Sequence, residues 1–490
     1  MTVSGENPST ELRLRPTGWE SSPESEQFPL SLMGHIMPKI YVLIAEVFSL
    51  PEDADAGAIV QSMAAGLEFA LSQFPILTGV LEMDADSGRM WVSKKRNSTV
   101  NLHIKHMARE DEFPSYEDLA KEDFPASLIV GNKLLPESVT AKQLHSPLGD
   151  NNEEGIPVAA FQLNFIRGGL IVGVAVHHAL SDGPGCDGFL TTWAENSAAA
   201  ASGTPFVTAN HQFKLQGSPF DVEKPTPQQM EKLETAFPLV KDAGGPMPPP
   251  PADFKMPSLV CQMWHFPKSK AEALKLQVSS KVEDGWVSTY DVVMALLWSS
   301  VSRAKLEMLK PNLDSKAILV HAVDTRKVWN PALPERFLGV GSCGARCEPL
   351  AIKDIIAPDN LSKVAATVRA SINTVTPQYL TGLLQWIAGR DDKRWLEISL
   401  KSFLGMDFGA SSWQGMTAYE KHNFGFGWPK ALRWPSPPFE GFVFLYPSRA
   451  AHKYPSEDEG IEVCVCLEKS CMDRLMKDET LLAYAHPRGP

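Results

Sequence analysis

The feature of this sequence that most constrains its fold is an apolar run that ends in two adjacent histidines. Residues 170–176 read LIVGVAV, and a run that is apolar at every position predicts a central strand buried on both faces. His177 and His178 follow directly, and Asp182 and Gly183 come shortly after them. Successive side chains of a strand point to opposite faces, so one histidine can face a cavity while the other is packed in the core.

Three interpretations of the two histidines follow from the residues alone. They can be structural residues at the end of a strand. A metal site would need a third and a fourth ligand, and only Asp182 is close in sequence, so we expect no metal. One imidazole held by a rigid loop in a site of low dielectric constant can instead act as a general acid or base.

Composition excludes several classes of protein. The chain has 490 residues, enough for more than one domain, and 58 acidic against 46 basic residues give a net charge of −12. This charge argues against a nucleic-acid partner, which requires a basic surface. We find no signal peptide and no apolar run that suggests a membrane span. The seven cysteines are odd in number and scattered, which favours a reducing compartment, and we expect a cytoplasmic protein.

The pattern along the chain predicts two lobes of mixed α/β content. Residues 1–27 are polar and are expected to form a flexible tail, with at most a short strand around residues 12–14. Residues 28–202 alternate between strand and helix patterns and form the first lobe. Residues 203–253 lose periodicity and end in a proline run, so they are expected to cross over to a second lobe at 254–490.

Local signals predict particular elements within these lobes. Two hairpins are expected, with turns at residues 86–88 and 167–169. A helix is expected after the histidines, within residues 186–201. Another should begin at Ser288 and Thr289, because a hydroxyl side chain there precedes an apolar stripe.

Several motifs together resemble one known superfamily. HHALSDG at residues 177–183 resembles the HHxxxDG motif of the chloramphenicol-acetyltransferase-like superfamily, and NFGFGWP at 423–429 is similar to the DFGWG signature of its BAHD branch. The segments SSW at 411–413, DTR at 324–326 and STYDVVMALLW at 288–298 also have counterparts in the family. The resemblance covers nearly the whole chain and is strongest to the BAHD and the fungal trichothecene acetyltransferase-like acyltransferases.

This resemblance implies a fold and an activity. The fold is α/β, with two chloramphenicol-acetyltransferase-like lobes, each a mixed sheet with helices, and a tunnel between them. The activity is acyl transfer from acyl-CoA, most often acetyl-CoA, to a hydroxyl of a secondary metabolite such as a terpenoid or a polyketide. His178 would be the general base, without an acyl-enzyme, and the only partners would be the acceptor and acyl-CoA, which is a co-substrate rather than a resident cofactor. We expect a monomer.

The resemblance also implies roles for other residues. Asp182 would pair with Arg326 rather than orient His178, and Ser411 and Trp413 would lie near the reacting atoms as hydrogen-bond donors. The remaining candidates form two groups. The first would bind coenzyme A at or near the start of the helix expected from Ser288 onward, and the second would have structural roles in loops. The first group is Ser288, Thr289 and Lys281, and the second is Gly183, Asn423, Gly425 and Gly427.

Departures from the family pattern leave alternatives open. Asn423 replaces the aspartate and Phe426 the tryptophan of DFGWG, while Met33 and Val340 stand where the family has other polar residues. We expect these changes to affect packing more than chemistry. A donor carried by a carrier protein, another base-assisted reaction such as cyclisation, and a non-catalytic binding protein remain alternatives.

Overall fold

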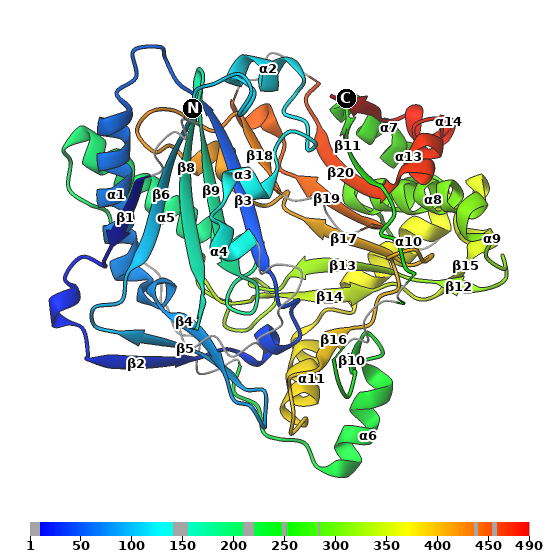
Figure 1. Cartoon of the computed structure of the whole chain (residues 1–490). Coiled ribbons are helices and arrows are strands. Elements are labelled where there is room, and N and C mark those ends of the chain that lie inside the picture. The colour runs from blue at the N-terminus through cyan, green and yellow to red at the C-terminus, as the bar shows by residue number, and fades with distance from the viewer. Residues whose placement is uncertain are drawn as a thin grey trace.

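The computed structural model describes residues 10–140, 155–208, 220–246, 251, 253–282, 285–435, 440–452 and 458–489. Within these residues the chain forms two lobes that lie side by side, each built on a large mixed sheet (Figure 1). The N-terminal lobe runs from blue to the green of α5, with orange β18 added at its edge, and the C-terminal lobe runs from green to red. This is the two-lobed α/β architecture that the sequence predicts.

The first sheet has the histidine strand near its centre. Its strands, in spatial order, are β1 (Thr10–Leu14), β6 (Val100–Met107), β8 (Ala159–Ile166), β9 (Gly169–His177), β3 (Tyr41–Ser49) and β18 (Ala431–Arg433). β9 pairs antiparallel with both β8 and β3, and every residue of β8 and β9 is buried. The buried strand and its hairpin are therefore confirmed. Helices α1 (Ala56–Gln73) and α5 (Gly183–Ser202) pack together against this sheet.

The second sheet forms the C-terminal lobe and has seven strands among the described residues. Its order is β14 (Ser342–Arg346), β13 (Leu319–Asp324), β17 (Phe408–Ser412), β19 (Phe442–Tyr446), β20 (Ile461–Glu468), β11 (Leu259–Phe266) and β21 (His486–Arg488). Its helices are α7 (Lys268–Ser279), α8 (Thr289–Leu309), α9 (Ile352–Ile356), α10 (Leu361–Asn373), α13 (Lys469–Leu475) and α14 (Glu479–Leu482). Helix α8 is buried along most of its length and packs on this lobe's own hydrophobic core.

Smaller elements surround the two lobes. A four-stranded sheet contains β2 (Ser25–Pro29), β5 (Met90–Lys95), β4 (Val80–Met83) and β7 (Ile156–Pro157). Two-stranded sheets are formed by β10 (Val240–Asp242) with β16 (Leu396–Ile398) and by β12 (Lys316–Ala317) with β15 (Leu350–Ala351). The remaining helices are α2 (Tyr116–Lys121), α3 (Gly131–Leu134), α4 (Glu137–Thr140), α6 (Pro227–Ala236), α11 (Pro377–Ala388) and α12 (Ala418–Lys421).

The predicted domain boundaries need three corrections. The prediction of a flexible tail at residues 1–27 is wrong from residue 10 onward, because β1 pairs with β6 and β2 pairs with β5. Residues 1–9 lie outside the described residues. The crossover contains α6 and β10, so it is not irregular throughout, although the proline run at 247–250 lies outside the described residues. The boundary between the lobes is also not a single point in the sequence. β18 comes late in the chain but belongs to the first sheet, because it pairs antiparallel with β3.

Within the described part of the chain, no helix is both long and apolar enough to cross a membrane.

Candidate active site

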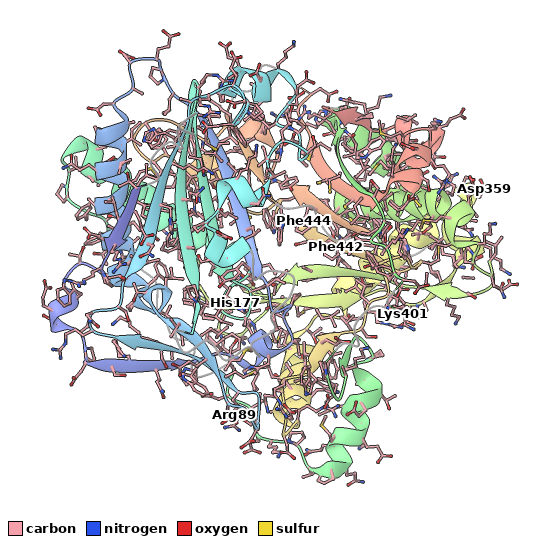
Figure 2. All side chains as sticks on the ribbon, viewed as in Figure 1. Arg89, His177, Asp359, Lys401, Phe442 and Phe444 are labelled. Atoms are coloured by element: carbon pink, nitrogen blue, oxygen red, sulfur yellow. The ribbon has the colours of Figure 1, made fainter. Side chains whose placement is uncertain are left out.

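A cavity of about 310 Å³ lies between the two lobes. The first lobe lines it with the segment that leads into β3 and with the loop that follows β9. The second lobe lines it with β13, β14, β17 and β19. Figure 2 labels His177 in the first lobe and Phe442 and Phe444 in the second, toward the junction of the lobes. Each lobe alone supplies only one wall, so the site requires both.

His178 is the histidine that faces this cavity. Its backbone N–H donates to the carbonyl of Ile40 at 2.8 Å, which holds the end of β9 against β3. Its Nδ1 is buried without a hydrogen-bond partner, so Nε2 is the nitrogen with access to the cavity. Burial lowers the pKa of His178 below the ordinary value of 6.5, although its own carbonyl and Asp182 act in the opposite direction. A neutral imidazole with a free Nε2 is equipped to accept a proton.

His177 points to the other side and is part of the packing. Its ring makes an edge contact with Tyr41 at 5.2 Å, and its Nδ1 accepts a hydrogen bond from the backbone N–H of Ala179 at 3.2 Å. Burial lowers the pKa of His177 to about 3, so the ring is uncharged. The alternation of side chains along β9 separates the two histidines into one cavity residue and one structural residue.

Asp182 joins the two lobes instead of orienting the base. Arg326 Nη2 donates to Asp182 Oδ1 at 2.7 Å and Arg326 Nη1 donates to Oδ2 at 3.2 Å. Asp182 is also the N-cap of α5, accepting from Gly185 N at 2.9 Å, and it accepts from Gly341 N at 2.8 Å. Burial is the largest single effect and acts to raise the pKa of Asp182. Attraction and hydrogen bonding to Arg326, together with hydrogen bonds from Gly185 and Ser342, leave the pKa below its ordinary value. The structure thus shows the predicted pair, and it fixes the loop that carries His178.

Gly183 permits close contact between this loop and Trp413. A Cβ atom at Gly183 would lie 2.9 Å from Trp413 Nε1, closer than side chains tolerate. Trp413 is itself buried, and its ring packs beside Trp434 and Phe444 at centroid distances of 5.6 and 5.7 Å. Trp413 and Ser411 both line the cavity, so the structure brings them together with His178 as predicted.

The predicted coenzyme A residues lie outside this cavity. Ser288 is the N-cap of α8: its hydroxyl donates to Asp291 at 2.9 Å and accepts from Arg369 at 2.7 Å. The helix start is therefore confirmed. Thr289 is the first residue of α8, and Lys281 is exposed after the end of α7. Their role in binding coenzyme A stays a prediction.

The NFGFGWP segment forms a loop away from the cavity. Asn423 Oδ1 accepts from the backbone N–H groups of Gly425 and Gly427 at 2.9 and 3.4 Å. Gly425 and Gly427 have φ angles of +100° and +133°, where a side chain would be strained. Phe426 packs edge-on against Phe48 at 5.2 Å. These contacts are structural, as expected for residues that depart from the family signature without touching the reacting atoms.

Sequence reasoning missed two residues beside the site. His321 lines the cavity, and hydrogen bonds to Tyr290 at 2.9 Å and Ser371 at 2.8 Å occupy its ring nitrogens. Lys39 lies behind the first-lobe wall. Neither stands in a recognisable motif. Among the residues that the structure describes, no group of three or more His, Cys, Asp and Glu side chains could hold a metal ion.

The fold and the site define an acyltransferase of the two-lobed BAHD type. Comparison with family models identifies the family: the Transferase family model matches residues 130–482, and the trichothecene 3-O-acetyltransferase-like N-terminal domain model matches residues 40–195. The chain belongs to this Transferase family.

Individual relatives agree with this assignment. The chain is 30% identical to acetyltransferase FGR3 of Gibberella zeae, over 97% of this chain and 93% of that protein. It is 25% identical to trichothecene 3-O-acetyltransferase TRI101 of Fusarium sporotrichioides, over 95% of this chain and 98% of that one. The structure of F. graminearum TRI101 complexed with coenzyme A and T-2 mycotoxin matches with a TM-score of 0.76 at 20% identity, covering 95% and 100% of the two chains.

Proposed function

We propose that this protein is an acyl-CoA-dependent O-acyltransferase that transfers an acetyl group to a hydroxyl of a small secondary metabolite. The observation that carries the proposal is His178: an imidazole with lowered pKa and an accessible Nε2, held in a cavity between the lobes. The names of relatives support the acetyl donor, since FGR3 is an acetyltransferase and a TRI101 structure contains coenzyme A with T-2 mycotoxin.

In this mechanism His178 Nε2 removes the proton of the acceptor hydroxyl as its oxygen attacks the thioester carbonyl. The tetrahedral intermediate collapses with breakage of the C–S bond, and the proton passes from His178 to the departing coenzyme A thiolate. The products are an ester and coenzyme A, and no acyl-enzyme forms. General base catalysis of this kind contributes roughly 10²–10⁴-fold to the rate.

The negative oxygen of the intermediate requires a hydrogen-bond donor. Trp413 presents its indole N–H beside Gly183, next to the loop that carries His178, and Ser411 lines the same cavity from β17. We assign these two side chains as the donors. Asp182 and Arg326 act through the position of the loop, because their hydrogen bonds join them to one another, to Asp324 and to backbone groups.

The cavity favours an uncharged, apolar acceptor. One wall of the cavity is aromatic and is formed by Trp413, Trp434, Phe442 and Phe444. The ring centroids of Trp434 and Phe444 lie 4.7 Å apart. Flat or fused-ring alcohols, including terpenoids and polyketides, suit such a wall. We place the phosphates of coenzyme A at the start of α8, where Ser288 and Thr289 begin the helix and Arg369 of α10 donates to the Ser288 hydroxyl. Lys281, which follows the end of α7, is the further candidate.

The decisive test is release of coenzyme A thiol from acetyl-CoA in the presence of a panel of hydroxylated terpenoids and polyketides. His178→Ala should lower the rate by roughly 10²–10⁴-fold while circular dichroism shows an unchanged fold. His103→Ala, a partly exposed histidine on β6, is the matched control and should keep full activity. Equal activity of His178→Ala and the wild type would contradict the proposal.

We further propose that the protein works as a monomer in the cytoplasm. All residues of the cavity come from a single chain, and all seven cysteines are free, as a reducing compartment requires. Light scattering at enzyme concentrations used in the assay would test the first point, and imaging of a fluorescent fusion the second.

A further inference from the structure

One wall of the cavity is a short extended segment, residues 399–405, which we call the strap. It leads from β16 toward β17, and its residues Leu400 and Ser402 line the cavity. Lys401 and Phe403, which alternate with them, are exposed. Successive side chains of an extended segment point to opposite sides. The strap therefore has an inner side toward the cavity and an outer side toward solvent.

The first end of the strap is held by the segment that crosses between the lobes. β16 pairs antiparallel with β10, and the backbone N–H of Ser399 donates to the carbonyl of Leu239 at 2.7 Å. Figure 1 shows β10 and β16 side by side. The crossover thus fixes where the strap begins.

The second end is held by a buried ion pair. Lys305 of α8 contacts Glu440 at 3.0 Å, and both side chains are buried. Lys305 Nζ also donates to the carbonyls of Ser402 at 3.0 Å and Gly405 at 2.8 Å. The backbone N–H of Leu404 donates to Glu440 at 2.9 Å. A strap anchored at both ends presents its inner side chains in a fixed position.

Leu400 and Phe442 together close this end of the cavity. A Cβ atom at Gly409 would lie 2.3 Å from the Phe442 ring and 3.0 Å from Leu400 Cδ2. The two side chains therefore lie over the space that Gly409 leaves open on β17, and both line the cavity. This end wall is apolar, and its position sets the length of the cavity.

Ser402 places one polar group in this apolar end wall. The residue is only 8% exposed, and its carbonyl is occupied by Lys305 and by the N–H of Gly405. Its hydroxyl has no hydrogen-bond partner among the residues that the structure describes. A buried hydroxyl that lines a cavity and lacks a protein partner can bind a polar group of the ligand.

The position of the strap favours contact with the acceptor rather than with coenzyme A. Lys305 lies toward the C-terminal end of α8, about 24 Å from Thr289 at ~1.5 Å per residue. The phosphates of coenzyme A are placed at the Thr289 end. From Gly409 to Trp413 the chain spans about 13 Å at ~3.3 Å per residue. An acceptor with its reacting hydroxyl beside Trp413 can reach the strap with its opposite end.

We propose that Leu400 and Ser402 select the acceptor: Leu400 limits the length of its apolar skeleton, and the Ser402 hydroxyl binds an oxygen function at the end remote from the reacting hydroxyl. The acceptor is then a fused-ring alcohol that carries a second hydroxyl, carbonyl or epoxide group. The inference rests on the proposed function and specifies a polar contact that the aromatic wall does not provide. Neither residue takes part in proton transfer.

The first experiment compares kcat/KM for pairs of fused-ring alcohols that differ only in the second oxygen function, with acetyl-CoA as donor. Ser402→Ala should lower kcat/KM about two- to tenfold for the member with two oxygen functions, which is the effect of one neutral hydrogen bond. The member with one hydroxyl should not respond, and KM for acetyl-CoA should not change. Lys401→Ala, on the outer side of the strap, is the matched control and should alter neither member.

The second experiment tests the limit on length. Leu400→Ala should shift the ratio of kcat/KM for long over short acceptors upward by about tenfold, because a shortened side chain lengthens the cavity. Phe403→Ala removes an exposed side chain of the same strap and should leave this ratio unchanged. Circular dichroism of each variant checks that the fold is intact.

The outcomes separate the inference from the function on which it rests. An equal loss for both members of the pair, or an effect confined to KM for acetyl-CoA, would overturn the role of Ser402. An unchanged length preference in folded Leu400→Ala would overturn that of Leu400. Calorimetry with the same alcohols measures the Ser402 contact without turnover. A wild type that binds these alcohols but releases no thiol would instead overturn the proposed function.

Discussion

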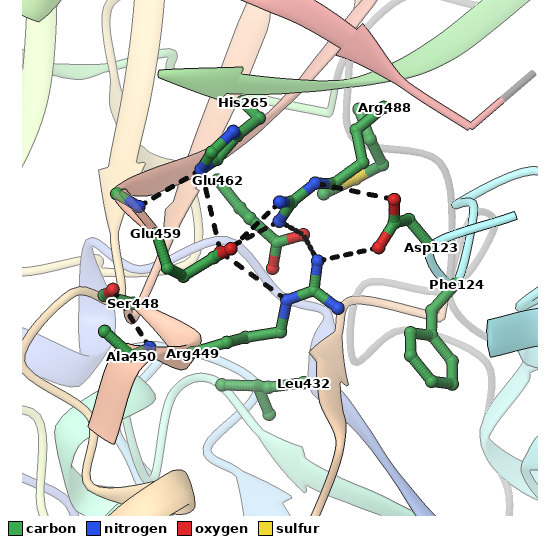
Figure 3. Close-up of polar contacts among 12 residues, drawn as sticks. Asp123, Phe124, His265, Leu432, Ser448, Arg449, Ala450, Glu459, Glu462 and Arg488 are labelled. Atoms are coloured by element: carbon green, nitrogen blue, oxygen red, sulfur yellow. Dashed lines mark hydrogen bonds and ion pairs between the residues drawn. The ribbon is translucent and has the colours of Figure 1, made fainter. Parts of the chain in front are cut away.

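Two buried charge clusters join the lobes, and they differ in what lies beside them. One is the pair of Asp182 and Arg326 at the cavity, described above. The other lies around Glu462 on β20 and contains Arg433, Arg449 and Arg488. Figure 3 shows two of these arginines, Arg449 and Arg488, beside Glu462. Both clusters link the first sheet or its loops to the second, so both stabilise the same junction.

The cluster at Glu462 is the denser of the two. Arg433 on β18 makes a bidentate contact with Glu462 at 3.0 and 3.1 Å, and Arg449 and Arg488 approach the same carboxylate at 3.1 and 3.0 Å. Burial acts to raise the pKa of Glu462, but the three arginines lower it to about 2. Asp123 from the first lobe pairs with Arg449 at 3.1 Å and extends the cluster across the junction.

The two clusters differ in whether their residues contact the loop that carries His178 and the cavity. Asp182 caps α5 and precedes Gly183, whose backbone lies against Trp413, so any movement there shifts the base and a proposed oxyanion donor together. None of the residues at the Glu462 cluster lines the cavity. Burial and charge pairing at the lobe junction therefore do not by themselves place a residue beside the reacting atoms.

Glu462→Gln should have the largest effect on stability. It leaves the buried Arg433 and Arg449 and the half-buried Arg488 without their common carboxylate, and breaking a buried pair costs ~3–5 kcal/mol. Thermal and urea unfolding would measure the loss. Activity per folded molecule should not change, and Glu335→Gln, an exposed carboxylate paired with Lys421, should be nearly silent in both assays. A large fall in kcat/KM of folded Glu462→Gln would remove the distinction between the clusters.

The same variant has a defined pH dependence. The folded pKa of Glu462 is about 2, below its ordinary 4.5, so its stabilising contribution is present above pH 4.5 and is lost as the pH falls toward 2. The difference in stability between wild type and Glu462→Gln should therefore shrink as the pH is lowered below about 4.5. A constant difference across that range would show that the carboxylate is not the stabilising group.

Asp182→Asn should lose less stability and more activity. Arg326 keeps its contacts with Asp324 and with the carbonyls of Phe337 and Gly339, so the stability loss should be nearer ~1–3 kcal/mol. The loop that carries His178 loses its ionic anchor, and a misplaced base lowers kcat/KM by roughly 10²-fold. Normal activity in folded Asp182→Asn would show that the Asp182–Arg326 pair, like the Glu462 cluster, stabilises the fold without positioning His178.

Gly183→Ala tests the close contact at the cavity. The added methyl group would press on Trp413 Nε1, and such overpacking costs ~1–3 kcal/mol. We expect kcat to fall more than the affinity for acetyl-CoA. Gly245→Ala is the control, because nothing lies within 4 Å of a Cβ atom at that position. Equal behaviour of the two variants would show that the contact with Trp413 is unimportant.

A third buried pair should give the smallest effect. His422 Nδ1 contacts Glu46 at 2.6 Å and its Nε2 lies 3.4 Å from Asp187. Burial acts to lower the pKa of His422, but Glu46 and Asp187 together raise it above 6.5. Protonated His422 therefore stabilises the fold below about pH 6.5, and this contribution is lost as the pH rises through the folded pKa. His422→Gln should lower the melting temperature more at about pH 6 than at about pH 8.5. Equal losses at both pH values would contradict the charged pair.

The site was predictable where local sequence carries the chemistry. His178, Asp182 and Gly183 stand together in one motif, and their positions follow from a strand that ends and a helix that begins. Arg326, Ser411 and Trp413 were predicted only through the resemblance, and the structure places them at the same cavity or its anchor. Lys39 and His321 had no such signal, because their environment is made by residues distant in sequence.

Patterns in the amino-acid sequence were enough to predict the two-lobed α/β class, the buried histidine strand and the capped helix α8, and the resemblance of several motifs to one family predicted acyltransfer chemistry. These depend on side-chain periodicity, caps and a short motif, which act over a few residues. The pairing of β1 and β2 with other strands, the return of β18 to the first sheet and the place of His321 at the cavity became visible only in the folded chain. Those outcomes depend on burial and on contacts between remote segments, which exist only after the two lobes have packed together.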